Sequence, residues 1–255
     1  MIEVISVCKE FNGQQVLKEI TATFRNGKTN LIIGRSGAGK TVLLKCIVGL
    51  FTPEEGKVLY DGRDISAMGK KETLKLRQEI GMLFQSSALF DSMSVLENVM
   101  FPLDMFSAMS YNERRERARF CLDRVGLIEA QYKNPDELSG GMQKRAAIAR
   151  AIALGPKYLF CDEPNSGLDP KTSLVIDALI HDITEEYNMT TIINTHDMNS
   201  VMGIGDSIIY IYQGHKEWEG TKDEVFTATN QRLNDFIFAS DLLKKVKEEE
   251  NHSSK

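Results

Sequence analysis

The segment Leu31–Thr41 joins an apolar run to a stretch with three closely spaced glycines and a Lys-Thr pair. We expect the apolar run to form a strand and a helix to begin near Gly39, which is the context that a phosphate-binding loop requires. Glycine lets the backbone curl so that successive N–H groups point at phosphate oxygens, and the helix dipole favours negative charge there. Lys40 would neutralise the β and γ phosphates, and Thr41 would hold Mg²⁺. The pattern predicts a P-loop, and the alternative is a glycine turn without a ligand.

Two adjacent carboxylates, Asp162 and Glu163, follow the apolar run Tyr158–Cys161. Adjacent side chains at a strand end point in different directions, so one acid can reach a metal while the other faces an attacking water. We therefore predict that Asp162 lies in the Mg²⁺ shell and that Glu163 is the general base in phosphoryl transfer to water. Alone, such a pair is usually a solvated turn, but a P-loop in the same chain favours the catalytic interpretation.

A third group, Ser139-Gly140-Gly141, opens the predicted helix Met142–Ala153. Serine is a common helix cap, and the start of a helix attracts anions. This second phosphate-binding segment lies far from the P-loop in the sequence, and a head-to-tail dimer could use both by closing each copy's Ser139 segment over the other copy's nucleotide. An ordinary helix cap remains the alternative.

The elements that must position these groups alternate along the chain. Segments rich in β-branched residues are separated by helical patterns, which predicts an α/β fold with a largely parallel sheet covered on both faces. The early strands, separated by turns at Asn12-Gly13 and Asn26-Gly27, predict an antiparallel side sheet. No strand pattern occurs between Ser86 and Leu154, where we expect a helical insertion that includes a helix at Asn112–Val125. The predicted strands are Ile2–Val7, Val16–Phe24, Thr29–Ile33, Lys57–Tyr60, Ile80–Phe84, Tyr158–Cys161, Thr190–Asn194 and Ser207–Tyr212.

The composition is that of a folded globular protein, with 42% hydrophobic and 26% charged residues in a chain of 255. A net charge of −5 argues against nucleic acid as the main partner. No apolar run approaches the roughly 18 residues that a membrane helix needs, so a membrane role would have to come through a partner. The cysteines have no metal-ligand spacing, and we expect them to be buried and reduced. They are Cys8, Cys46, Cys121 and Cys161.

Six motifs, in this order and spacing, resemble those of the ATP-binding cassette (ABC) proteins. They are Gly34–Thr41, Gln85, Leu138–Met142, Tyr158–Glu163, Ser166–Asp169 and His196. The resemblance covers about residues 1–226. It implies an ABC cassette with a RecA-like core, an antiparallel β side sheet and a helical subdomain inserted at about 86–154. It also implies an ATPase that works as a homodimer with ATP and Mg²⁺, attached through integral-membrane permease subunits to the cytoplasmic face of the inner membrane.

The same resemblance implies roles for single residues. Phe11 would stack on adenine, although alone it would more commonly be a core residue. Gln85 would touch Mg²⁺ and the attacking water while sensing the membrane partner, and His196 would contact the γ-phosphate, although a lone histidine there is usually structural. Asp169 would lie at the dimer seam and link the two sites. The residues expected to contact ATP are Phe11, Gly34, Arg35, Ser36, Gly37, Ala38, Gly39, Lys40, Thr41, Val42, Ser139, Gly140, Gly141 and Asp169, and those expected at Mg²⁺ are Thr41, Gln85 and Asp162.

The usual glutamine after Leu-Ser-Gly-Gly is replaced here by Met142. The motif Leu138–Met142 and the segment Leu89–Val99 resemble sequences in the ATPases of Mla-type (MCE-associated) lipid transporters. Such a resemblance implies phospholipid as cargo, moving between the inner and outer membranes, and a periplasmic MCE lipid-carrier protein as a further partner. The alternatives are a lipoprotein or drug exporter, a small-solute importer and, more remotely, a non-transport P-loop ATPase or kinase.

Two segments are open to more than one interpretation. Leu89–Phe106 is rich in Met, Phe and Leu, and it could line a groove for a short permease helix or pack within the insertion. Residues 227–255 form a C-terminal extension in which Phe236–Phe238 could contact the opposite subunit, whereas Asp241–Lys255 reads as a solvated end.

Overall fold

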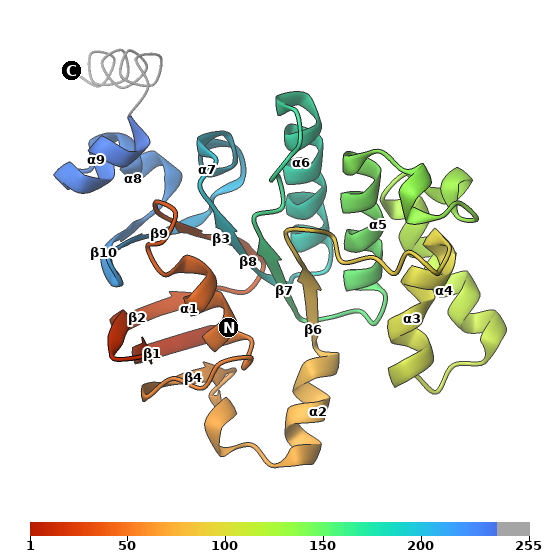
Figure 1. Ribbon diagram of the computed structural model, residues 1–255, viewed down its shortest axis with the longest axis horizontal. Helices are drawn as coiled ribbons and strands as arrows, with labels where there is room; N and C mark the ends of the chain where they lie inside the picture. The colour runs from red at the N-terminus through yellow and green to blue at the C-terminus, as the bar shows by residue number, and fades with distance from the viewer. Residues whose placement is uncertain (239–255) are drawn as a thin grey trace. The chain divides into compact units, whose positions relative to one another are not determined.

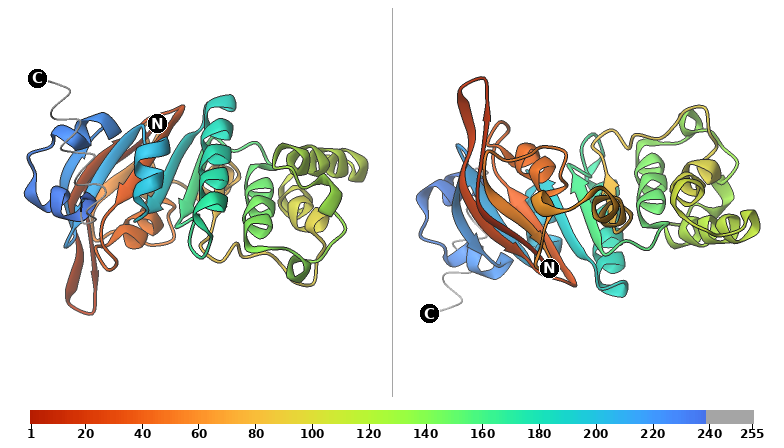
Figure 2. Two further views of the ribbon diagram at one scale, coloured as in Figure 1. Left: turned by 90° about the horizontal axis from the view of Figure 1, so that it is seen from above. Right: turned by 90° about the horizontal axis from the view of Figure 1, so that it is seen from below.

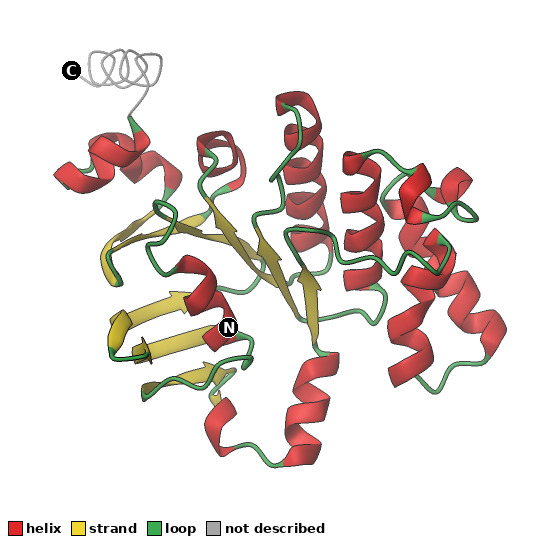
Figure 3. Cartoon of the chain, in the orientation of Figure 1, coloured by secondary structure: helices red, strands yellow, loops and turns green. Residues whose placement is uncertain are grey.

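The computed structural model describes residues 1–238 (Figure 1). The chain is organised as two units. The first unit contains Met1–Ala67 together with the described residues from Asn194 onward, and the second contains Met68–Ile193. Helices and strands alternate through both units (Figure 3). The predicted α/β class is therefore confirmed, while the solvated end predicted at Asp241–Lys255 lies outside the described residues.

An antiparallel sheet in the first unit has the strand order β2-β1-β4-β5. Its strands are β1 (Ile2–Phe11), β2 (Gln14–Phe24), β4 (Glu55–Tyr60) and β5 (Arg63–Asp64). The β1–β2 turn has φ values of 51° at Asn12 and 81° at Gly13, as a two-residue hairpin turn of the primed type requires. The predicted antiparallel side sheet is thus present, and it contains the hairpin expected at Asn12-Gly13.

The first unit also contains three strands in the order β10-β9-β3. β3 (Lys28–Ile33) runs parallel to β9 (Ser207–Tyr212), and β10 (His215–Gly220) runs antiparallel to β9. The turn Asn26-Gly27 therefore leads out of the side sheet, whereas the sequence placed it between two strands of that sheet. The reason is visible in β3, which is buried from Thr29 to Ile33, as a parallel strand covered on both faces is. The helices of this unit are η1 (Ile65–Ala67), α1 (Lys40–Ile47), α7 (Met198–Ile204), α8 (Lys222–Thr227) and α9 (Gln231–Ile237).

The second unit combines the strands β8-β7-β6 with a helical region. β6 (Ile80–Leu83) is parallel to β7 (Tyr158–Asp162), and β8 (Thr190–Thr195) ends across the boundary between the units. Every element between Ser86 and Leu154 is helical, and α3, α4 and α5, coloured yellow to green, pack on one another (Figure 2). The helices are α2 (Lys70–Gln78), α3 (Val95–Phe106), α4 (Tyr111–Arg124), η2 (Ile128–Ala130), η3 (Pro135–Glu137), α5 (Gly140–Ile152) and α6 (Pro170–Glu186).

Two of these helices begin with a capping box built on serine. Ser94 opens α3 and Ser110 opens α4, and in each case a glutamate three residues later bonds back to the serine N–H at 2.7 Å. Such capping boxes satisfy backbone donors that a helix start would otherwise leave open. The hydrogen bond from each serine hydroxyl lowers the pKa of Glu97 and Glu113, so both carboxylates stay charged while they cap.

All four cysteines are buried free thiols, as the sequence predicted. Burial raises the pKa of Cys46 and of Cys121 to about 11, and it raises the pKa of Cys161 as well. Because the thiolate is the reactive form, these side chains behave as small apolar core residues.

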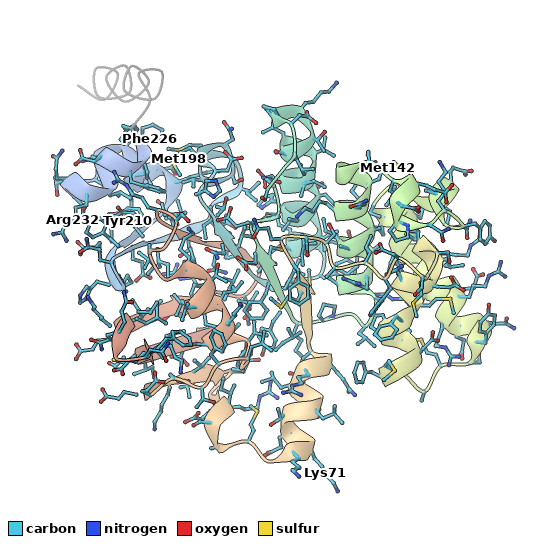
Figure 4. All side chains as sticks on the ribbon, viewed as in Figure 1. Lys71, Met142, Met198, Tyr210, Phe226 and Arg232 are labelled. Atoms are coloured by element: carbon cyan, nitrogen blue, oxygen red, sulfur yellow. The ribbon has the colours of Figure 1, made fainter. Side chains whose placement is uncertain are left out.

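The end of the described chain packs onto β9. Phe236 stacks on Tyr210 with 5.3 Å between ring centroids, and the Arg232 guanidinium lies 4.8 Å from the centre of the Tyr212 ring. Tyr210 and Arg232 are labelled in Figure 4. Ile237 and Phe238 are 1% and 5% exposed. The aromatic side chains considered for contact with an opposite subunit are therefore occupied within their own unit.

No helix among residues 1–238 is both long enough and apolar enough to cross a membrane.

The β9–β10 turn ties the glycine loop to the side sheet. Gly214 donates its N–H to the Ala38 carbonyl at 3.2 Å and accepts from the Lys18 N–H at 2.9 Å. A Cβ added to Gly214 would lie 2.4 Å from the Val16 carbonyl oxygen. Gly13 has nearly the same φ, 81° against 83°, but an added Cβ there meets nothing within 4 Å.

We therefore expect Gly214→Ala to lower the free energy of unfolding more than Gly13→Ala does. The left-handed φ should cost about 1 kcal/mol at both positions, and the clash with Val16 should bring the Gly214 variant to about 3 kcal/mol or more. Chemical denaturation of the two variants measures the difference. Equal losses would show that the crowding around Gly214 is relieved by small shifts.

Candidate nucleotide-binding site

The glycine loop between β3 and α1 has the shape that the sequence predicted. Gly34, Gly37 and Gly39 have φ values of 152°, 79° and 106°. A Cβ on Gly34 would lie 2.3 Å from the backbone oxygen of Ile211 on β9, so only glycine fits at the start of the loop. The loop is therefore built into the first unit by direct backbone contact.

Lys40 lies across this loop and is 6% exposed. Its Nζ donates to the Gly34 carbonyl at 2.9 Å and to the Arg35 carbonyl at 3.3 Å. Helix α1 begins directly after Gly39, and no side chain caps it. An uncapped helix start beside a positioned ammonium group is suited to bind phosphate, so these residues fit the phosphates of ATP.

Thr41 is oriented by a residue that sequence reasoning missed. The Nδ2 of Asn194, a buried residue near the end of β8, donates to the Thr41 Oγ1 at 3.2 Å. The next residues are also fixed, because Asp197 donates its N–H to the Thr195 hydroxyl at 3.0 Å and caps α7. His196, between them, is exposed. The signal in the sequence was an amide near the end of an otherwise apolar and β-branched strand.

Phe11 ends β1 and is 39% exposed, so it is not the core residue that it would be on average. Its ring meets Phe51 edge-on with 5.4 Å between centroids, and the Lys9 ammonium lies 5.1 Å from its centre. A partly exposed aromatic ring held on one edge can stack on a planar base. Its contact with adenine remains a prediction.

The two carboxylates after β7 are placed by a turn. Asp162 is the last residue of β7, and Glu163 follows with a left-handed φ of 51°. The sequence argument relied on the alternation of a strand, but Glu163 has already left the strand. What separates the two side chains is therefore the backbone turn, in which Ser166 N–H donates to the Glu163 carbonyl at 3.1 Å.

A buried hydrogen bond between two side chains connects this turn to α6. The Nδ2 of Asn165 donates to Asp177 Oδ1 on α6 at 2.8 Å, and both side chains are less than 10% exposed. Breaking a buried hydrogen bond of this kind would leave polar atoms without a partner in the protein interior, which costs free energy. Neither residue was predicted, because nothing in the sequence shows that these positions pair.

Gln85 is joined to the same turn. Its Nε2 donates to the Ser166 hydroxyl at 3.1 Å, whereas its Oε1 makes no hydrogen bond within residues 1–238. The carbonyl of Gln85 accepts from the Lys144 ammonium at 2.5 Å. Sequence reasoning brought Gln85 to the site by resemblance, and the structure shows its side chain beside the residues that follow Glu163.

Two cations on α5 hold the segment after β6. Lys144 bonds to Gln85 as described, and Arg150 donates to the carbonyls of Ser87 and Ala88 at 2.8 and 2.6 Å. Burial lowers the pKa of Lys144, although nearby Cys161 and Asp162 oppose this effect. Ser87 and Ala88 both have positive φ values, of 63° and 48°, so this backbone is held in a conformation that costs energy. Both cations were missed in the sequence.

The Ser139 segment meets the Asp169 segment through Thr172. Ser139 caps α5 by accepting from the Met142 N–H at 3.4 Å, at the end of α5 marked by the Met142 label in Figure 4. Asp169 caps α6 and accepts from the Thr172 N–H at 3.0 Å and from its hydroxyl at 2.5 Å. These bonds, the hydroxyl first, lower the pKa of Asp169. A Cβ on Gly141 would lie 2.5 Å from the Thr172 Cγ2, so the two helix starts are in close contact.

The predicted site residues thus form two groups. The first unit carries Phe11, the loop from Gly34 to Val42 and His196, and the second carries Gln85, Ser139-Gly140-Gly141, Asp162, Glu163 and Asp169. Within residues 1–238 no three His, Cys, Asp or Glu side chains cluster to hold a metal. Mg²⁺ usually binds one or two carboxylates together with phosphates and waters. The hydroxyl of Thr41 in the first unit is an oxygen donor of the kind that Mg²⁺ accepts, and so are the Oε1 of Gln85 and the carboxylate of Asp162 in the second unit.

A family model described as ABC transporter matches residues 17–166, which include the glycine loop, the Ser139 segment and both carboxylates. The chain belongs to the ABC transporter family. It carries the ATPase domain of that family, and the fold predicted from the resemblance is confirmed.

Three relatives illustrate the range of this family. The intermembrane phospholipid transport ATP-binding protein MlaF of Haemophilus influenzae is 38% identical over 237 residues, with 93% of this chain and 90% of the relative covered. The methionine import ATP-binding protein MetN of Clostridium acetobutylicum is 37% identical over 94% and 75% of the two chains. The probable ribonucleotide transport ATP-binding protein mkl of Mycobacterium tuberculosis is 36% identical over 92% of this chain, which spans only 66% of that relative's length.

Solved structures of the cassette MJ0796 have the same fold. Two dimeric structures of this bacterial ABC transporter cassette, one in a post-hydrolysis state bound to ADP and Pi, each superpose with a TM-score of 0.79. They are 36% and 35% identical in sequence, and each match covers 87% of this chain and 99% of the cassette.

We expect Lys40→Ala to weaken ATP binding about 10- to 100-fold, because a charge-assisted bond to phosphate contributes about 1.5–3 kcal/mol. A titration with a fluorescent ATP analogue measures the affinity. Lys28→Ala is the matched control, since Lys28 is half exposed and pairs with Asp206 at 3.6 Å on the surface of the same unit. Equal affinity of the Lys40 variant and the unchanged chain would contradict the assignment of the glycine loop.

Proposed function

We propose that this chain hydrolyses ATP as one of two cassettes of a membrane transporter that moves phospholipid between the inner and outer membranes of a bacterial envelope. The observation that carries the hydrolytic part is the buried Lys40 ammonium held across a glycine loop at an uncapped helix start. The cargo is supported by the similarity to MlaF, which covers 90% of that relative.

Each part of the reaction has residues that suit it. Lys40 and the loop N–H groups bind the phosphates, and Thr41, Gln85 and Asp162 hold Mg²⁺, which when bound would neutralise phosphate charge. Glu163 accepts a proton from the attacking water. His196 contacts the γ-phosphate. Phosphoryl transfer in such sites depends mainly on positioning and charge, which explains why buried hydrogen bonds surround these groups.

The second phosphate-binding segment acts on the nucleotide of a partner copy in this proposal. Ser139 and Asp169 are exposed and lie at two helix starts in close contact, so a second chain can reach both. The dimeric MJ0796 structures support a homodimer. ATP binding would draw the two copies together, and hydrolysis would release them.

A groove in the second unit suits a permease helix. Its volume is about 410 Å³, and its lining is mainly apolar, from β6, α3 and α5. Phe90 and Phe101 line it with 4.8 Å between ring centroids. Arg150, which holds the segment after Gln85, also lines it and lies 6.0 Å from the centre of the Phe90 ring. A short amphipathic helix docks in grooves of this kind. The groove would attach the chain to permease subunits at the cytoplasmic face of the inner membrane and connect them to Gln85.

The domain organisation that we propose follows from these roles. Residues 1–226 form the ATPase domain with a helical insertion at about 86–154, and residues 227–255 form a C-terminal extension. Phe236, Ile237 and Phe238 pack within their own unit, so we do not assign them to a contact with a partner copy.

We expect Glu163→Gln to keep ATP binding but to slow hydrolysis about 100-fold or more, because general base catalysis contributes that much. The variant should accumulate as an ATP-bound dimer, which size-exclusion chromatography with and without ATP detects. Glu129→Gln, an exposed change on η2, is the control. Hydrolysis near the normal rate would remove Glu163 as the base.

Identifying the proteins and lipids that bind to this chain tests the proposed cargo. Extraction in mild detergent with this chain as bait should recover an integral-membrane permease, an MCE-type periplasmic lipid-carrier protein and bound phospholipid. Mass spectrometry identifies all three. Recovery of a solute-binding protein would instead place the chain with importers of small solutes, and recovery of a permease without phospholipid would favour an exporter of other cargo.

A further inference from the structure

Helix α2 presents its basic residues on one face. At 100° per residue, Lys70, Lys71, Lys75 and Arg77 fall within an arc of roughly 160°, and the buried Leu76 lies opposite the middle of that arc. Leu74 lies within the arc and is 49% exposed. The helix therefore has a buried side with one leucine and a solvent side with four cations around a second leucine.

These four cations have no partner in the described chain. None of their side chains makes a hydrogen bond or an ion pair with any of residues 1–238. The single acidic residue of the helix, Glu72, accepts from the Gly69 N–H at 3.0 Å and so caps the helix start. Figure 4 shows Lys71 projecting outward from α2. A concentrated positive face is unusual on a chain whose net charge is −5.

The C-terminal end of α2 leads directly into strand residues that line the apolar groove described above. α2 ends at Gln78, and Ile80 and Gly81 line the groove. The residue between them, Glu79, accepts from the Lys157 N–H at 2.9 Å and pairs with its ammonium at 3.3 Å. Leu154, three residues before Lys157, lines the groove from the turn after α5. The end of α2 is therefore bonded to the loop that forms one margin of the groove.

We propose that the basic face of α2 binds anionic phospholipid headgroups at the membrane surface around the permease. The basic face would be turned toward the membrane only if the groove receives a permease helix. The inference therefore rests on the proposed function. Lysines and arginines on an amphipathic helix are attracted to anionic membranes, and an exposed leucine among them can enter the headgroup layer. The chain would thus be held at the membrane by its permease and by lipid together.

A lipid surface fits this face better than an acidic peptide does. Three of the four cations are lysines, which act as flexible point charges, whereas recognition of particular carboxylates favours arginine in a shaped site. The four cations all lie on the solvent side of one helix. The headgroups of anionic lipids are mobile within the membrane surface, so they can pair with these cations without a fixed binding geometry.

Co-sedimentation with vesicles tests the proposal on the full chain, without permease or ATP. Binding should be strong to phosphatidylcholine vesicles that contain phosphatidylglycerol, weak to phosphatidylcholine alone, and lost in high salt. Each basic residue near an anionic surface strengthens binding about fivefold. The quadruple variant with Lys70, Lys71, Lys75 and Arg77 all changed to Gln should therefore bind at least about 100-fold more weakly. Glutamine keeps the helix propensity.

A second quadruple variant provides the matched control. Changing Lys18, Lys57, Lys133 and Lys222 to Gln also takes the net charge from −5 to −9, but these residues are dispersed over the chain. Its binding should fall much less than that of the α2 variant. An equal fall in both variants, or equal binding of the unchanged chain to neutral and anionic vesicles, would overturn the proposal.

Two further readouts separate the proposal from its alternatives. Circular dichroism and ATP affinity of the α2 variant should match the unchanged chain, which shows that folding and the nucleotide site are intact. If the α2 variant still binds vesicles but no longer co-purifies with the permease, the face serves a protein partner and the lipid proposal is wrong. If vesicle binding behaves as expected but no permease is recovered with any variant, the proposed function fails instead.

Discussion

The close approach of the Gly34 backbone to the Ile211 carbonyl is the constraint on which the nucleotide site depends. A side chain at position 34 would overlap that oxygen, at 2.3 Å from its Cβ, and the Ala38 carbonyl farther along the loop is bonded to Gly214. The loop is therefore shaped at two points by the β9–β10 hairpin before any nucleotide arrives. Lys40 can then use carbonyls of the same loop to hold its ammonium in place. Such preorganisation means that little ordering is left to be done when phosphate binds.

Helix α5 has a comparable role in the second unit, because one helix carries the serine cap, a contact to Gln85 and part of the groove lining. Ser139 begins it, Lys144 holds the Gln85 carbonyl from its middle, and Arg150 near its end holds Ser87 and Ala88 and lines the groove. From Ser139 to Arg150 the helix rises about 16 Å. A displacement at the groove would reach both Gln85 and the serine cap through a single element with a continuous hydrogen-bond ladder.

The sequence was most informative where one type of residue was required locally. Glycine spacing and β-branched runs placed the loop and eight of the strands, and helical patterns placed α1, α4 and α5. Helices α2, α3, α6 and α7 were not placed individually. β5 and β10 were missed because the first has two residues and the second is mostly polar. Contacts between distant positions could not be predicted. Nothing along the chain indicates that Lys144 reaches Gln85, that Asn165 pairs with Asp177, or that Asn194 orients Thr41. The sheet that β3 joins was also not predicted, since a short turn can connect two strands of a hairpin or lead to another sheet.

The left-handed backbone at Glu163 has a consequence for how this position can vary. A non-glycine residue with φ near 51° costs about 1 kcal/mol relative to glycine, and β-branched residues fare worse. Folding alone would thus prefer glycine or asparagine there, whereas proton transfer requires a carboxylate. Selection for stability and selection for catalytic turnover therefore favour different amino acids at this position. If variants of the chain are ranked once by thermal stability and once by growth of the cells that depend on them, the two rankings should differ most at residue 163.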